Sequence, residues 1–166
     1  MYRMGKEEID AVARVIESKQ LFKITAGPYK ETENFEKEMR ELLGVDHAVA
    51  MTSGLAALTC ALIGMGIGPG DEVIVPAYTY IATAIAVVAA GAIPVIAEVD
   101  ESLTIDPIDV EKKITKATKA IIPVHIQGFP VFIGCKVANK TVPFSISWHL
   151  IPSFLRNCKR NHYLFR

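Results

Sequence analysis

Aspartate and glutamate are absent from residues 131–166, although the chain of 166 residues contains 18 of them. Residues 1–130 carry a net charge of −6, and residues 131–166 a net charge of +6. Alanine and glycine nearly disappear at the same point, since 18 of 19 alanines and 10 of 11 glycines precede residue 131. This coupled change predicts a boundary near Pro130. We interpret residues 1–130 as one folded part and residues 131–166 as a basic tail, a frame-shifted or otherwise foreign extension.

The basic tail has six positive charges without helical or motif order, which does not favour a nucleic-acid or membrane partner. Two of its segments, Val131–Ile133 and Thr141–Ile146, are nevertheless rich in residues that favour strands. An alternative interpretation is therefore a genuine tail that pairs with an open sheet edge.

Cysteine is scarce, and Cys60, Cys135 and Cys158 form no C-x-x-C pair. This spacing suggests neither a disulfide framework nor a zinc site. Cys60 lies in an apolar helical run, where a small buried hydrophobic residue is the plain interpretation. The cysteine spacing leads us to expect no metal ion. The first residues contain acids where a signal peptide needs an apolar stretch, so we expect a cytoplasmic protein.

No charge occurs from Val73 to Ala97, a length that could span a membrane. Pro76, Gly91 and Pro94 divide this run into short pieces, and a buried strand, a helix and a second strand fit it better. We therefore expect no membrane partner.

Hydrophobic periodicity predicts amphipathic helices over Lys6–Ser18 and Glu33–Leu43, the second ending at Gly44. Apolar segments then alternate with helical ones, which predicts parallel strands near 47–52, 72–76, 93–99 and 120–124. The intervening helices are expected over 55–65, 79–90 and from Asp106-Pro107 onward. The fold class is therefore α/β: an incomplete, open, mostly parallel sheet with helices on both faces and an exposed apolar edge or face.

Two turns at predicted strand ends could carry chemistry. Thr52-Ser53-Gly54-Leu55 starts a helix, whose free N–H groups and positive end can hold a phosphate; a simple Ser53 N-cap is the alternative. Pro76–Tyr80 places two tyrosines where open α/β sheets bind ligands. These aromatic rings could stack on a flat ligand or pack in the core.

A series of short motifs accompanies the predicted elements: Thr52-Ser53-Gly54 with Ala56-Ala57-Leu58, Gly66-Ile67-Gly68-Pro69-Gly70-Asp71-Glu72-Val73, Pro76-Ala77-Tyr78-Thr79-Tyr80-Ile81-Ala82-Thr83, Gly91-Ala92, Pro94-Val95, Asp100, Ile105-Asp106-Pro107 and Ile122-Pro123-Val124-His125-Ile126-Gln127-Gly128. In this order and spacing, residues 1–130 resemble the DegT/DnrJ/StrS family of pyridoxal-phosphate aminotransferases, which act mainly on keto sugars attached to nucleotides. The resemblance implies part of the large domain of a fold-type-I pyridoxal-phosphate transferase.

The resemblance also implies a cofactor site made of Ser53, Gly54, Leu55 and Tyr80. Gly54 and Leu55 would offer backbone amides to the phosphate of pyridoxal 5'-phosphate, and Tyr80 would stack on its pyridine ring. Leu55 stands where the family usually has threonine or serine, so a hydroxyl contact is lost while the backbone contact can persist.

Two further residues have two interpretations each. Thr83, one helical turn after Tyr80, could face the same pocket or pack within its helix. His125 could act as a base or hold the loop after its strand.

After Gly128-Phe129-Pro130 the family continues with an aspartate that pairs with the pyridine nitrogen and a lysine that forms the Schiff base. The tail has no acid, and Lys136, Lys140 and Lys159 lack the family context, so we identify no catalytic residue. Two functions stay open. One is the N-terminal part of a homodimeric aminotransferase that uses an amino-acid donor and a nucleotide keto sugar. The other is a non-catalytic α/β remnant whose affinity for the cofactor is weak or absent.

Overall fold

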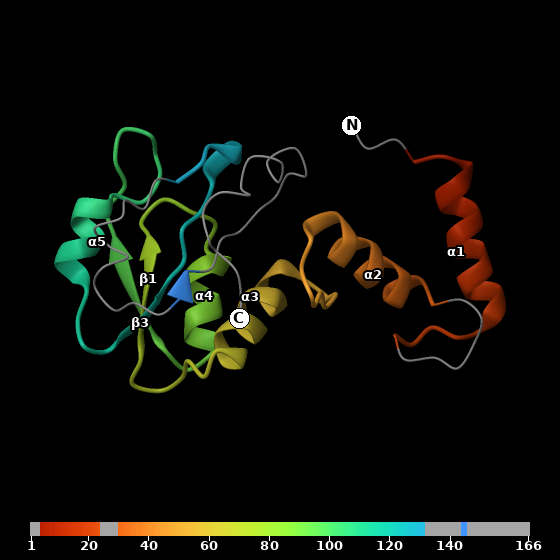
Figure 1. The fold of residues 1–166 in the computed structure, drawn as a ribbon, viewed down its shortest axis with the longest axis horizontal. Coiled ribbons are helices and arrows are strands. Elements are labelled where there is room, and N and C mark those ends of the chain that lie inside the picture. The colour runs from red at the N-terminus through yellow and green to blue at the C-terminus, as the bar shows by residue number, and fades with distance from the viewer. Residues whose placement is uncertain (1–3, 24–29, 132–143, 146–166) are drawn as a thin grey trace. The chain divides into compact units, whose positions relative to one another are not determined.

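The computed structural model describes residues 4–23, residues 30–131 and the backbone of residues 144–145. The chain divides into two compact units, Met1–Ala50 and Met51–Arg166, which we describe separately. Figure 1 shows helices α1 and α2 in the first unit and a sheet with its helices in the second.

The first unit contains α1 (Lys6–Ser18) and α2 (Glu31–Leu43), as the hydrophobic periodicity predicts. The Glu8 carboxylate accepts the N–H of Gly5 at 2.6 Å and so caps the start of α1. Helix α2 ends at Gly44, whose φ of +66° suits glycine. Neither helix has a buried residue within the described ranges, so both apolar faces are exposed.

The described residues of the second unit form a parallel sheet of four strands in the order β2-β1-β3-β4. They are β1 (Glu72–Pro76), β2 (Ile93–Ala97), β3 (Thr118–Ile121) and β4 (Phe144–Ser145). The connecting elements are α3 (Gly54–Gly64), α4 (Ala82–Ala89), α5 (Pro107–Lys113) and a 3-10 turn, η1 (Ile126–Gly128). The predicted parallel α/β architecture is confirmed.

Helices cover both faces of this sheet. Alternate side chains of β1 point to opposite faces, so Val73 and Val75 join one cluster and Ile74 joins another. The first cluster contains Leu58 and Leu62 of α3 and Ala86 and Val87 of α4, and the second contains Val110 of α5. The buried strands thus position the loops at their carboxyl ends rigidly.

One predicted strand is wrong, because residues 47–52 form no strand in the structure. A strand is stable only when its backbone pairs with a neighbour, and no strand of the described sheet pairs with this segment. Val49 and Met51 are accordingly exposed. The residue types of this segment favour an extended backbone, but they do not supply a strand to pair with.

Other element bounds shift by a few residues. β2 stops at Ala97 rather than Val99, and Val99 instead makes an isolated antiparallel bridge with Ile105. β3 begins at Thr118, two residues earlier than predicted. Helix α4 begins at Ala82, because the residues before it form the turn that follows β1.

Apolar surface is exposed at the sheet edge formed by β2, as expected for an incomplete sheet. Ile93 and Ile96 of β2 are about half exposed, and so are Ile85 and Val88 of α4. Within the described ranges, every helix is too short or too polar to cross a bilayer.

Candidate functional site

The turn before α3 presents two free backbone donors. The Ser53 hydroxyl accepts the N–H of Ala56 at 3.1 Å, and the Ser53 carbonyl accepts the N–H of Ala57 at 3.0 Å. Ser53 is therefore an N-cap. In the part of the chain that the structure describes, the N–H groups of Gly54 and Leu55 donate to no acceptor. Two donors at the positive end of a helix can hold an anion.

The Leu55 side chain packs against the core cluster below α3. This packing explains how leucine can occupy a position where the DegT/DnrJ/StrS family usually has threonine or serine. The side chain stabilises the helix, while the backbone N–H of Leu55 remains available at the helix end.

The aromatic turn between β1 and α4 exposes its tyrosines. The Tyr80 side chain is 71% exposed and Tyr78 is 53% exposed, so the core-packing interpretation is wrong for both. The backbone of this turn is well fixed: the Ala77 N–H donates to the carbonyl of Ala97 at 2.7 Å, and the Thr83 N–H donates to the carbonyl of Tyr80 at 3.0 Å. The turn thus offers an aromatic face to a ligand.

Both turns lie at the carboxyl edge of the sheet. Helix α3 runs to Gly64 and leads into the start of β1, so its own start lies toward the end of β1. Tyr80 follows the end of β1 directly, and α3 packs against α4. This is the edge at which open α/β sheets bind ligands.

Thr83 is wholly buried in α4, so it packs within the helix rather than facing a pocket. Its hydroxyl oxygen lies 2.9 Å from that of Thr79, in a hydrogen bond across one helical turn. Sequence reasoning quoted both residues but missed their pairing. The Thr-x-x-x-Thr spacing is the one signal for it in the sequence, and it does not show by itself that Thr83 is buried.

The His125 side chain accepts a hydrogen bond from the backbone. Its Nδ1 accepts the N–H of Val131 at 3.0 Å, which ties the segment after β3 back to the strand end. This contact favours the loop-holding interpretation over a general base, because the lone pair on Nδ1 is already engaged.

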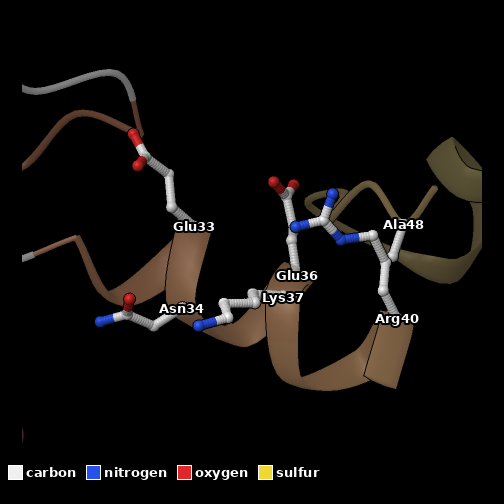
Figure 2. Close-up of a pocket in the computed structure, with 6 residues that line it drawn as sticks. All are labelled: Glu33, Asn34, Glu36, Lys37, Arg40 and Ala48. Carbon is white, nitrogen blue, oxygen red and sulfur yellow. The ribbon is translucent and has the colours of Figure 1, made fainter. Parts of the chain in front are cut away.

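A separate polar hollow of about 300 Å³ lies beside α2 in the first unit. Figure 2 shows its lining residues: Glu33, Asn34, Glu36, Lys37, Arg40 and Ala48. The Lys23 ammonium at 2.6 Å and the Ala50 N–H at 2.7 Å bond to the Glu36 carboxylate and hold its pKa below the usual value. These bonds tie the neighbouring chain segments to α2, a structural role that sequence reasoning missed.

The described residues contain no group of three or more histidine, cysteine or acidic side chains that could hold a metal ion. Cys60 is exposed rather than buried, which corrects the expectation for that residue. Lys136, Lys140 and Lys159 lie outside the described residues, as do Cys135 and Cys158.

Comparison with known proteins relates the chain to sugar aminotransferases. It is 50% identical over 131 residues to the dTDP-3-amino-3,4,6-trideoxy-alpha-D-glucose transaminase of Streptomyces venezuelae, covering 78% of this chain and 33% of that protein. The chain spans about a third of the length of the curated relatives it matches.

Solved structures give the same result. DesV of S. venezuelae superposes with a TM-score of 0.75 at 45% identity, over 85% of this chain and 38% of that one. NtdA of Bacillus subtilis, solved with bound cofactor PMP, superposes with a TM-score of 0.69 at 32% identity. The match covers 87% of this chain and 34% of NtdA. A model of the DegT/DnrJ/EryC1/StrS aminotransferase family matches residues 2–134, so this chain belongs to that family.

Proposed function

We propose that this chain carries the cofactor-phosphate part of a pyridoxal-phosphate-dependent sugar aminotransferase. Ser53, Gly54, Leu55 and Tyr80 form that part: the turn before α3 holds the phosphate, and Tyr80 covers one face of the pyridine ring. The observation that carries the proposal is the pair of free N–H groups at the start of α3.

The donor set fits a phosphate. Two backbone N–H groups at a helix N-terminus are donors to anionic oxygens, and hydrogen bonds to a charged group contribute about 1.5–3 kcal/mol each. Ser53 shapes this turn by capping α3, so its hydroxyl is committed to the N–H of Ala56 and orients the free donors.

The aromatic turn fits the ring. Tyr80 is exposed at the same edge of the sheet, so its ring can stack on a flat pyridine without a loss of core packing. When bound, pyridoxal phosphate supplies an electron sink for the amino acid. The described residues bind and orient it; none has been assigned to proton transfer.

The relatives suggest the substrates. A transaminase of a dTDP-linked amino sugar is half identical to this chain over the matched residues. We infer an amino-acid donor, a nucleotide-linked keto sugar as acceptor, a homodimer as the working assembly and a cytoplasmic location.

The second candidate is a non-catalytic remnant that binds the cofactor weakly. Residues 131–166 contain no acid that could pair with the pyridine nitrogen. We therefore expect the chain by itself to bind pyridoxal phosphate weakly and reversibly, without turnover.

Equilibrium dialysis of the full chain against pyridoxal phosphate tests the proposal. Saturable binding at one site is the expected result. Uptake that rises linearly with concentration would contradict it, because scattered contacts with surface lysines do not saturate as one site.

We further propose that residues 131–166 are a foreign extension, and that removing them costs the fold little. The family match ends at residue 134, close to the charge boundary at Pro130. The short β4 lies in Thr141–Ile146 and pairs with β3 at two positions, which supports the alternative of a tail that pairs with an open sheet edge. Reading the coding DNA downstream of codon 130 in its other two frames is expected to reveal an aspartate and a lysine in family context. Two frames without them would contradict the proposal.

A further inference from the structure

We propose that Thr79 and Thr83 are a positioning pair: their hydroxyl bond fixes the turn 77–81, so that Tyr80 is held ready for a flat ligand. This inference rests on the proposed function, because the ligand that Tyr80 meets is the pyridine ring. The pair itself touches neither cofactor nor substrate.

Burial of Thr83 gives the first reason. Its side chain is fully buried in an otherwise apolar helix, beside Ala82, Ala86 and Val87, which are buried too. A buried hydroxyl without a hydrogen bond is costly, so the hydroxyl needs its partner. The bond to Thr79 at 2.9 Å supplies that partner and draws Thr79 toward the helix.

The start of α4 gives the second reason. The residue at its N-cap position, Ile81, has no side chain that can accept a hydrogen bond from the first turn. The Thr79–Thr83 bond spans the same stretch and joins the turn to the helix. The pair thus links the turn to the first residues of the helix through side chains, at a helix start that has no N-cap side chain.

Exposure of Tyr80 gives the third reason. Tyr80 as a whole is 71% exposed, so core packing does not hold its ring. Its backbone is fixed on both sides: Thr79 is held through its hydroxyl, and the Tyr80 carbonyl accepts the N–H of Thr83. An aromatic side chain on a fixed backbone loses less conformational entropy when it binds a ring.

The test uses the full chain with Thr83→Val, which keeps the shape of the side chain and removes its hydroxyl. Thr83→Ser is the matched control, because it keeps the hydroxyl and removes a methyl group. The first readout is amide hydrogen exchange of Ala77 and Thr83 without cofactor, because their N–H groups donate to Ala97 and Tyr80 at the two ends of the turn. We expect Thr83→Val to raise this exchange about fivefold, in line with the loss of one hydrogen bond. The Thr83→Ser chain should exchange at the wild-type rate.

The second readout is the affinity for pyridoxal phosphate. The effect of Thr83→Val on this affinity is measured once in the wild-type chain and once in a chain that carries Tyr80→Leu. We expect Thr83→Val to weaken binding several-fold when Tyr80 is present and to have no effect when leucine replaces it. A purely structural role would lower overall stability in urea unfolding and leave the affinity for pyridoxal phosphate unchanged, which would overturn the proposal. Thr79→Val removes the same bond from the more exposed partner, and decides the matter if Thr83→Val does not fold.

The two proposals fail in different ways. If the wild-type chain binds no pyridoxal phosphate, the proposed function is wrong, and exchange at Ala77 and Thr83 decides the positioning role by itself. If the chain binds the cofactor and Thr83→Val leaves both exchange and affinity unchanged, only the positioning role is wrong.

Discussion

The Gly54→Pro variant is expected to bind pyridoxal phosphate at least about tenfold more weakly than the wild-type chain, with little loss of stability. Gly54 is the first residue of α3, and proline is well tolerated at that position because its missing N–H would be free in any case. Ser53 already has the extended backbone that a residue before proline requires, with φ −160° and ψ 162°. The substitution therefore removes a proposed phosphate donor and keeps the helix; a tenfold change corresponds to about 1.4 kcal/mol.

Pyridoxal, which lacks the phosphate, is the control ligand for this variant. Its affinity should be the same for wild-type and Gly54→Pro chains, because the lost N–H has no phosphate to meet. Equal affinity of both chains for pyridoxal phosphate would show that the start of α3 does not hold the phosphate. Urea unfolding of both chains checks that the helix survives.

Replacing Leu62 by alanine is expected to lower the free energy of unfolding by about 3 kcal/mol, the middle of the range for a buried leucine. Leu62 is fully buried in α3 and belongs to the cluster that joins this helix to α4 and the sheet. Its loss leaves a cavity beneath the helix whose first residues present the free donors. Urea unfolding at one protein concentration measures the effect.

The neighbouring Ile63→Ala is the matched control. Ile63 lies in the same helix, yet 56% of its side chain is exposed, so its truncation should cost less than about 1 kcal/mol. Similar losses for the two variants would mean that α3 is not docked on the sheet through Leu62.

Local signals in the sequence predicted the elements that local physics determines. The Asp106 side chain caps α5 by accepting the N–H of Ile108 at 2.8 Å, and Pro107 occupies the first turn, as the residue types indicate. Residues 47–52 failed as a predicted strand because pairing depends on a neighbour elsewhere in the chain, which composition does not reveal.

The site was predictable only in part. The turns at Ser53 and Tyr80 could be found because small and aromatic residues follow apolar segments, and their assignment to cofactor binding stays a prediction. The Thr79–Thr83 bond could not be ranked from sequence, because a threonine four residues from another is as compatible with solvent exposure as with burial. Burial, which decides its role, depends on how α4 packs against the sheet.

The most direct measurement is a titration of the full chain with pyridoxal phosphate and with pyridoxal, each followed by borohydride reduction and peptide mapping. Our account predicts that pyridoxal phosphate binds at least about tenfold more tightly, through hydrogen bonds to its charged phosphate, and that reduction labels no single lysine at high occupancy. Equal affinities for the two ligands, or one lysine labelled at high occupancy, would contradict it.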